Sequence, residues 1–231
     1  MAPTALELSD INFRWSGRKR FSLSVPNLAI ETGDSVLLLG DSGSGKSTLL
    51  SLICGIVLPA TGSVQIEGQD LTNMSATARD RLRAEKIGVI FQQFNLLPFG
   101  TVADNIKLPL HFAPERNKRV SNPPESVRGL CAALGLPASI ITQKASTLSV
   151  GQQQRVAVAR ALIGQPPLIV ADEPTSALDE TNQSAFLDLL FEQTTKNGST
   201  LLMVSHDPRL ATRFQRVLHM RDIATVEGDD S

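Results

Sequence analysis

The chain has 231 residues, of which 42% are hydrophobic and 19% charged, a size that suits one large α/β domain or two small ones. Its formal net charge of -1 lacks the strongly basic balance of nucleic-acid-binding proteins, so no nucleic-acid partner is expected. The chain starts without a secretory signal pattern and no apolar run approaches the ~18 residues of a membrane-spanning helix, so any association with a bilayer is expected to come through another protein.

The first elements in chain order are expected to be β-strands of a small antiparallel layer. Serine, arginine and apolar residues partly alternate over residues 7–30, which is typical of strands with one buried face. Shorter apolar runs without such alternation follow, and they predict strands of a parallel sheet that is covered on both faces. These runs are Val36–Leu39, Ile87–Phe91, Leu168–Ala171 and Leu201–Val204.

Helical stretches separate these apolar runs, namely Ser47–Cys54, Gln152–Ile163 and Ser184–Thr194. Alternation of strands and helices predicts an α/β sheet. Residues 92–165 are mostly helical in character, although the polar, proline-bearing stretch 117–125 is expected to be an exposed loop. Residues 226–231 at the end of the chain are expected to be frayed. Cys54 and Cys131 show no metal-ligand spacing and are expected to be buried, reduced thiols.

The stretch GDSGSGKST, residues 40–48, directly follows the first of these parallel strands and fits the pattern G-x-x-x-x-G-K-[ST]. Gly43 and Gly45 allow backbone conformations that turn N–H groups inward toward phosphate oxygens. The following helix adds unpaired N–H groups, Lys46 can reach the β- and γ-phosphates, and the Ser47 hydroxyl can bind Mg²⁺. An ordinary glycine-rich turn is the alternative, but the strand before and the helix after favour phosphate binding.

Two later strands also end in polar residues. Asp172 and Glu173 follow Leu168–Ala171, and the crevice beyond the carboxyl ends of such strands is where α/β sheets bind ligands. Asp172 can then hold the Mg²⁺ shell and Glu173 can polarise an attacking water. His206 leaves the strand Leu201–Val204 and can donate to a γ-phosphate oxygen. The alternatives are exposed acids at a strand exit and an inert histidine in a turn.

The segment LSVGQQQRVAVARAL, residues 148–162, decides the class. It resembles the signature segment of ABC-type ATPases, usually LSGGQ followed by a basic amphipathic helix. Further motifs resemble that family in the same order, namely residues 40–48, IFQQ at 90–93, LIVADEP at 168–174, SALD at 176–179 and SHD at 205–207. The resemblance covers nearly the whole chain. It implies a P-loop NTPase, RecA-like α/β core with an antiparallel β layer and an inserted α-helical subdomain.

As domain organisation, the resemblance implies one ABC ATPase domain over residues 1–231. Residues 1–91 and 166–231 would form the core with its β layer, and residues 92–165 the helical signature subdomain. ATP and Mg²⁺ would be the ligands. Catalysis is assigned to Lys46, Gln92, Glu173 and His206, and metal binding to Ser47, Gln92 and Asp172. Nucleotide binding is assigned to Trp15, Gly40, Ser42, Gly43, Ser44, Gly45, Lys46, Ser47, Thr48, Ser149, Gly151 and Gln152.

Some of these assignments have specific chemistry and specific alternatives. Trp15 would stack on adenine where the family more often has tyrosine, although a core role is the alternative. Ser149 can cap the helix that follows, and Gly151 allows close approach of a phosphate. Val150 replaces the usual glycine and leaves the local backbone conformation open. Packing also explains that helix, because Val156, Ala159 and Ile163 form an apolar stripe, and the two roles are compatible. Asp179 resembles the aspartate that communicates across the dimer.

In this family each nucleotide lies between two chains, so a homodimer that sandwiches two ATP molecules is the simplest expectation. Residues 86–110 and the signature segment are similar to the branch of lipoprotein-releasing (LolD), macrolide-exporting (MacB) and cell-division (FtsE) ATPases. The expected partner is a separate transmembrane permease at the cytoplasmic face of the inner or plasma membrane. A groove near residues 92–105 would grip it, with apolar contacts from Phe94, Leu96, Leu97 and Phe99, unless these side chains are core.

Other functions stay open from the sequence. A DNA-associated ABC ATPase would typically carry a coiled coil or a zinc insertion between the phosphate-binding stretch and the signature segment, and neither is found there. A nutrient importer's ATPase and an FtsE-like regulator that moves no substrate are the further alternatives. The transported substrate and the direction of transport do not follow from the sequence.

Overall fold

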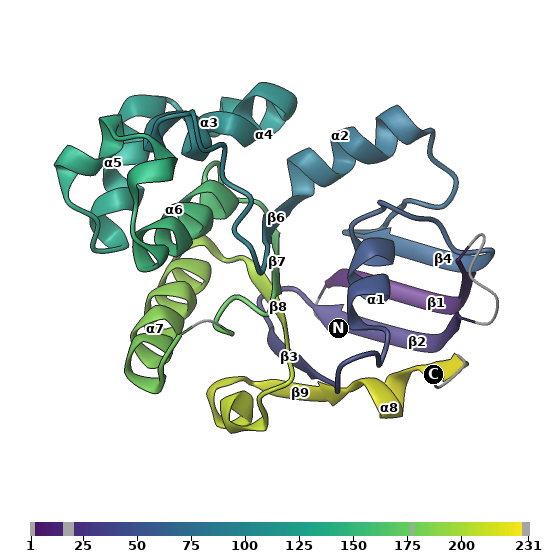
Figure 1. Cartoon of the computed structure of the whole chain (residues 1–231). Helices are drawn as coiled ribbons and strands as arrows, with labels where there is room; N and C mark the ends of the chain where they lie inside the picture. Colours follow the sequence, from purple (N-terminus) through teal and green to yellow (C-terminus); the bar gives the residue numbers. More distant parts are fainter. Residues whose placement is uncertain (1–2, 16–20, 177, 228–231) are drawn as a thin grey trace. The chain divides into compact units, whose positions relative to one another are not determined.

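The computed structural model describes residues 3–15, 21–176 and 178–227. They form two compact units, the first from the described parts of Met1–Arg83 and Thr200–Ser231, and the second from Ala84–Ser199. Helix α2 (Ala76–Lys86) contains the boundary between these two units. Each unit is described by itself below, with its elements labelled as in Figure 1.

An antiparallel sheet in the first unit confirms the layer expected near the start of the chain. Its strands, in the order in which they pair, are β10 (Thr225–Glu227), β2 (Ser22–Glu31), β1 (Thr4–Arg14), β4 (Thr61–Ile66) and β5 (Gln69–Asp70). Leu8 of β1 lies opposite Leu28 and Val64, and all three side chains are buried. The alternation read from the sequence therefore places one face of the sheet in a core. Residues 16–20 of that segment lie outside the described residues.

The end of the chain was expected to be frayed from residue 226, and this is wrong for Val226 and Glu227. Both belong to β10, where Val226 pairs with Leu23 of β2. A three-residue strand has too short a pattern to be read from sequence, and its position depends on the edge of β2. Residues 228–231 lie outside the described residues.

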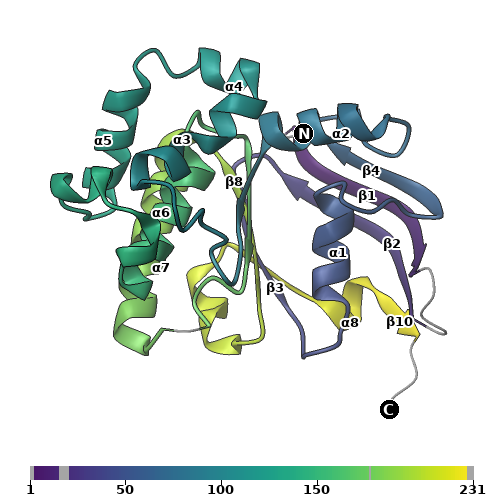
Figure 2. The same cartoon turned by 45° about the horizontal axis from the view of Figure 1, so that its top comes forward.

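The first unit also contains three parallel strands, and the two predicted ones are confirmed. Strand β3 (Ser35–Leu39) pairs in parallel with β8 (Thr200–Ser205) and with β9 (Arg216–His219), which the sequence did not predict. Helix α1 (Lys46–Ile53) follows β3, and both views show it alongside β1, β2 and β4 (Figures 1 and 2). The short elements η3 (Pro208–Arg213) and α8 (Met220–Ile223) complete the unit.

The second unit is a parallel strand pair with helices. Strands β6 (Ile87–Ile90) and β7 (Leu168–Asp172) pair in parallel, with Ile87 opposite Leu168 and Ile90 opposite Ala171, as the apolar runs predicted. Helix α7 (Glu180–Asn197) follows β7. Between the strands in sequence come α3 (Val102–Phe112), α4 (Pro114–Lys118), α5 (Pro123–Ala133), η1 (Ala138–Thr142), η2 (Ala145–Thr147) and α6 (Val150–Leu162).

The expectation of an exposed loop over residues 117–125 is wrong at both ends of the stretch. Asn117 and Lys118 close helix α4, and α5 already begins at Pro123. The Asn122 side chain caps α5 by accepting a hydrogen bond from Glu125 N, and proline is favourable at the first helical position because it has no N–H to satisfy. The prolines therefore mark the start of a helix, and the connection between α4 and α5 is short.

Helix α6 forms the centre of the second unit. Its apolar stripe Val156, Ala159 and Ile163 is fully buried, which confirms the packing role. The helix packs against α3, α5, α7 and β6, and Figure 2 shows α3, α5 and α6 gathered together. A Cβ atom at Gly88 of β6 would clash with the Ala161 carbonyl oxygen, so a glycine at this position allows the end of α6 to lie directly on the strand.

Candidate functional site

The phosphate loop (Gly40–Thr48) connects β3 to α1 through two left-handed glycines. Gly43 has a φ of 82° and Gly45 a φ of 90°, conformations that other residues rarely adopt. Gly45 is the N-cap of α1 and gives it no side-chain cap, so the first N–H groups of this helix have no capping side chain. Uncapped N–H groups and the positive end of a helix dipole attract an anion.

The polar groups of the loop fit a polyphosphate. Ser44 Oγ is buried and has no hydrogen-bond partner among the residues that the structure describes. Lys46 is only 7% exposed, and its Nζ donates to the carbonyl oxygens of Gly40 (2.5 Å) and Asp41 (2.8 Å), so the ammonium is held over the loop. The side chains of Ser42 and Ser47 are exposed. A buried, unpaired hydroxyl beside an ammonium suits phosphate oxygens.

Trp15 lies against the helix that follows the phosphate loop. Its Nε1–H donates to Thr48 Oγ1 at 3.2 Å, and its ring meets Phe13 edge to face with the ring centroids 5.0 Å apart. Phe13 is buried, whereas Trp15 is half-buried. The indole is therefore partly exposed while its N–H is anchored to Thr48 of the phosphate loop.

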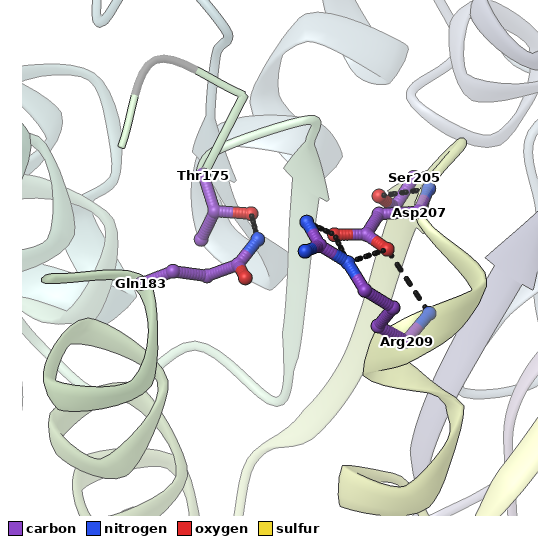
Figure 3. Close-up of polar contacts among 5 residues, drawn as sticks. All are labelled: Thr175, Gln183, Ser205, Asp207 and Arg209. Atoms are coloured by element: carbon purple, nitrogen blue, oxygen red, sulfur yellow. Dashed lines mark hydrogen bonds and ion pairs between the residues drawn. The ribbon is translucent and has the colours of Figure 1, made fainter. Parts of the chain in front are cut away.

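His206 lies at the same sheet edge as the phosphate loop. Strand β8 runs parallel to β3 with Ser205 opposite Leu39, and Gly40 N donates to the Ser205 carbonyl at 3.3 Å. His206 directly follows Ser205, and its side chain is exposed. The next turn contains local hydrogen bonds: Asp207 N donates to Ser205 Oγ, and the Asp207 carboxylate accepts from the Arg209 guanidinium at 2.9 Å (Figure 3).

In the second unit, three of the predicted residues share the carboxyl edge of the β6–β7 pair. Ile90 pairs with Ala171, so Gln92 lies two residues beyond the end of one strand, while Asp172 ends the other strand and Glu173 directly follows it. Gln92 is exposed, and both acids are half-buried. The parallel register therefore brings an amide and two carboxylates to one edge, as predicted from the apolar runs.

The turn that carries Glu173 has a strained backbone with supports on either side. Glu173 has a φ of 43°, which costs a residue with a Cβ on the order of 1–3 kcal/mol. Gln154 of α6 donates its Nε2–H to the Pro174 carbonyl at 2.7 Å. Gln183 of α7 points toward the same turn and donates to Thr175 Oγ1 at 3.2 Å (Figure 3). Strain at a carboxylate next to a sheet edge is typical of a functional position.

The signature segment (Leu148–Gln152) forms the start of α6 with an intact capping box. Ser149 Oγ accepts from Gln152 N at 3.3 Å, and Gln152 Oε1 accepts from Ser149 N at 3.0 Å. Val150, where glycine is usual, has no positive φ angle and its side chain is 53% exposed. A Cβ at Gly151 would meet only open space. Val150 therefore leaves the backbone helical and adds an apolar side chain to an open helix start.

Asp179 lies near the signature segment, across a shared pocket. It is the N-cap of α7, where its carboxylate accepts from Asn182 N at 2.9 Å and from Asn182 Nδ2 at 2.7 Å. These hydrogen bonds, above all the backbone one, hold the pKa of the Asp179 carboxyl below its usual value. A pocket of about 210 Å³ is lined by Val150, Gly151, Asp179 and Phe186, among others. Ala177 of the SALD stretch lies outside the described residues.

The apolar residues that were expected to form a partner groove differ in exposure. Phe94 is buried and belongs to the core, the alternative that the sequence left open. Leu96 and Leu97 are half-buried. Phe99 is 75% exposed, and such a large unburied aromatic side chain is typical of an interaction surface.

The predicted residues thus fall into two groups that the structure describes separately. The first unit brings together Trp15, the phosphate loop and His206, and the second brings Gln92, Asp172 and Glu173 to one strand edge. The sequence did not single out Gln154 and Arg160, whose buried side chains reach the loops after these strands. For Arg160, the available signal was its position as the one polar residue in the apolar run VAVARAL. Periodicity alone interprets such a residue as a sign that the helix is ending.

Comparison with known proteins agrees with this arrangement. The ABC transporter family pattern matches residues 23–176. The chain is 39% identical over 224 residues to the macrolide export ATP-binding/permease protein MacB of Hyphomonas neptunium, covering 96% of this chain but only 34% of that relative. It is 40% identical over 193 residues to the uncharacterized ABC transporter ATP-binding protein YbbA of Escherichia coli, covering 84% of this chain and 83% of YbbA.

A solved structure shares both fold and sequence. The dimeric ATP-binding cassette MJ0796, in a post-hydrolysis state bound to ADP and Pi, superposes with a TM-score of 0.76 at 33% identity and covers 93% of each chain. The fold is therefore the P-loop NTPase fold of the ABC cassettes, with its antiparallel β layer and helical insertion. From the family match, the relatives and the phosphate loop together, the chain belongs to the ABC transporter family as an ATP-binding cassette.

Proposed function

We propose that the chain hydrolyses ATP to power a separate membrane permease, in an export or mechanotransmission system of the lipoprotein and macrolide type. The observation that carries this proposal is that the chain contains both an intact phosphate loop and a strained glutamate at the exit of a parallel strand. In support, the chain resembles MacB over nearly its whole length, although it spans about a third of that relative.

The phosphate loop would bind the triphosphate. Ser44 Oγ and the N–H groups at the start of α1 can donate to phosphate oxygens, and Lys46 can exchange its carbonyl contacts for the β- and γ-phosphates. Ser47, Gln92 and Asp172 each have a side-chain oxygen, and Mg²⁺ is a hard cation that prefers oxygen ligands. We therefore assign these three residues to this metal. Mg²⁺, when bound, neutralises charge on the phosphate oxygens. Trp15 would stack on the base.

Glu173 would act as the general base in hydrolysis. Its carboxylate would accept a proton from the water whose oxygen bonds to the γ-phosphorus, while the bond from that phosphorus to the β-phosphate bridging oxygen breaks. The electron pair of that bond leaves with ADP. His206 would donate a hydrogen bond to a γ-phosphate oxygen, and Gln92 would orient the attacking water.

A homodimer would complete each site. Ser149 is exposed and a Cβ at Gly151 would meet open space, and the helix N-terminus favours an anion. We assign this surface to the γ-phosphate that the second copy holds, and Asp179 to contact between copies. The dimeric form of the MJ0796 cassette supports this assignment.

The permease would bind near Phe99, because this aromatic ring follows the Gln92 loop and is largely unburied. None of the described helices is long and apolar enough to span a membrane. We place the chain at the cytoplasmic face of the inner or plasma membrane, held there by the permease. Purification from detergent-solubilised membranes should recover a transmembrane chain with the wild type and less of it with Phe99→Ser.

The experiment that tests hydrolysis replaces Glu173 with glutamine. The Glu173→Gln chain should bind ATP normally, hydrolyse it at least ~100 times more slowly and accumulate as a closed dimer, because the base is lost while the charge-binding groups remain. Phosphate release and size-exclusion chromatography with ATP measure both effects. Glu192→Gln is the matched control, since it removes an exposed acid on α7. An unchanged turnover in Glu173→Gln would remove Glu173 from the role of base.

A further inference from the structure

Helix α6 carries two buried polar side chains that leave the helix and contact other loops. Gln154 is 2% exposed and Arg160 is 8% exposed, although both types of residue are mostly found at the surface. The hydrogen bonds described below all run from these two side chains to backbone carbonyl oxygens. A buried donor that contacts only backbone fixes the path of a loop, whatever its sequence.

Arg160 holds the loop that follows Gln92. Its Nη1 donates to the Asn95 carbonyl at 2.6 Å and its Nη2 to the Phe94 carbonyl at 2.5 Å. The planar guanidinium thus binds two consecutive carbonyls, a geometry that a lysine ammonium cannot reproduce with the same two donors. Burial lowers the pKa of Arg160, but the group remains charged at neutral pH.

The loop that Arg160 binds has an unfavourable backbone of its own. Phe94 has a φ of 58° and Asn95 a φ of 47°, so two successive residues with side chains adopt the left-handed region. Such conformations persist only where the surroundings hold them. Arg160 donates to both carbonyls of this turn. Because the turn begins at Phe94, directly after Gln93, its conformation fixes how Gln92 leaves strand β6.

Gln154 does the same for the other catalytic loop. Its Nε2 donates at 2.7 Å to the carbonyl of Pro174, the residue after the left-handed Glu173. One helix therefore contacts the backbone directly after Glu173 and two residues after Gln92, and the same helix begins at the Ser149 cap. Because a helix of 13 residues moves as a rigid rod, a displacement of α6 would shift both loops together.

We propose that Gln154 and Arg160 are positioning residues for hydrolysis, which fix Glu173 and Gln92 from the signature helix. This inference rests on the proposed function, because it assigns its effect to the hydrolysis step. Both side chains are buried and donate to loop carbonyls, and neither is among the residues that we assign to nucleotide binding. Loss of either should therefore slow the chemical step while nucleotide binding at the phosphate loop is retained.

The test compares Arg160→Met and Gln154→Met with wild type and with Arg155→Met. Arg155 lies on the same helix and also donates to two carbonyls, those of Leu134 and Gly135, which directly follow α5. Trp15 is the only tryptophan of the chain, so its fluorescence reports ATP affinity and the fraction of chains that bind nucleotide. Turnover is then expressed per nucleotide-binding chain, which removes the effect of partial unfolding.

Both test variants should lower kcat by at least tenfold while the ATP affinity stays within about threefold of wild type, because small misplacements of catalytic groups are costly. Arg160→Lys should regain part of the lost kcat, and Arg155→Met should stay within about twofold. Equal kcat per binding site in wild type and both variants would overturn the inference alone. A wild type that binds ATP but never hydrolyses it would overturn the proposed function, and this inference with it.

Discussion

At the scale of single residues, the site depends on backbone conformations as much as on side chains. Gly45 and Gly43 supply left-handed turns without strain, whereas Glu173, Phe94 and Asn95 adopt them with side chains present. The glycines open the phosphate loop to an anion, and the strained residues have neighbours that hold them in place. Three of the six described non-glycine residues with a positive φ angle therefore lie at or near the groups to which we assign chemistry.

Cys131 gives a prediction for the pH dependence of stability. Burial in α5 raises the pKa of this thiol to about 11 from an ordinary value of 9.0. The folded chain keeps the proton after the unfolded chain has lost it, so this stabilisation is complete below pH 9.0 and is lost as the pH rises to about 11. The loss should be on the order of 2 kcal/mol in the free energy of unfolding.

Urea unfolding of wild type and Cys131→Ala between pH 8 and 11 measures this difference. Lysines titrate in the same range, so the informative quantity is the wild-type value minus the variant value at each pH. That difference should shrink steadily above pH 9. A difference that stays constant over the range would show that the thiol is not protected from ionisation.

The sequence predicted the positions of the residues of the proposed site better than it predicted the residues that support them. The phosphate loop, the Asp172–Glu173 pair and His206 are read directly, because each follows an apolar run and parallel strands end at a common edge. Gln154 donates to a carbonyl that lies 20 residues away in the chain, and Arg160 donates to one that lies 66 residues away. No local pattern encodes such a contact, since it arises only when the helix packs.

At the scale of elements, α4 is a short helix with a large structural effect. Its Arg116 is fully buried, and its guanidinium donates to the carbonyls of Ile163 and Ala161 at 2.5 Å near the end of α6. The Glu85 carboxylate accepts from the backbone N–H groups of Glu115 and Arg116. Burial lowers the pKa of Arg116 to about 10, so it is still charged at neutral pH and satisfies the last carbonyls of α6.

Arg116→Met should therefore destabilise the chain strongly. The substitution leaves the buried carbonyls of Ile163 and Ala161 without their donor and removes the buried cation that interacts with Glu85, which should cost about 3 kcal/mol or more in the free energy of unfolding. Arg119→Met is the control, because Arg119 is exposed and also donates to a carbonyl, that of Gly164 at 2.8 Å. It should cost less than about 1 kcal/mol. Equal losses of unfolding free energy in the two variants would show that the buried Arg116 guanidinium contributes no more to stability than the exposed Arg119 does.

The elements that the sequence predicted are those with long or strongly apolar patterns. Strands β3, β6, β7 and β8 and helices α1, α6 and α7 were predicted within a few residues, because four or more consecutive apolar residues or a helical stripe mark them. Strands β9 and β10 and helix α4 were not. They are short, half exposed or polar, and they form because a neighbouring strand edge or Arg116 provides a contact.

At the scale of the whole molecule, the residues of the proposed site come from both compact units. Trp15, the phosphate loop and His206 belong to the first unit, and Gln92, Glu173 and Ser149 belong to the second. The residues assigned to nucleotide affinity therefore lie mainly in the first unit, and those assigned to hydrolysis and dimer formation lie mainly in the second. The account predicts that binding and turnover respond to different substitutions.

Magnesium-dependent binding of ATP tests the central claim most directly, with Trp15 fluorescence as the signal because this indole contacts Thr48 at the start of α1. Wild type should show a saturable change with ATP and Mg²⁺, and Lys46→Ala should weaken binding at least tenfold, since a charge that holds the phosphates is lost. Its urea unfolding curve should stay close to that of wild type. No saturable binding by folded wild type, or equal affinity in Lys46→Ala, would contradict the account.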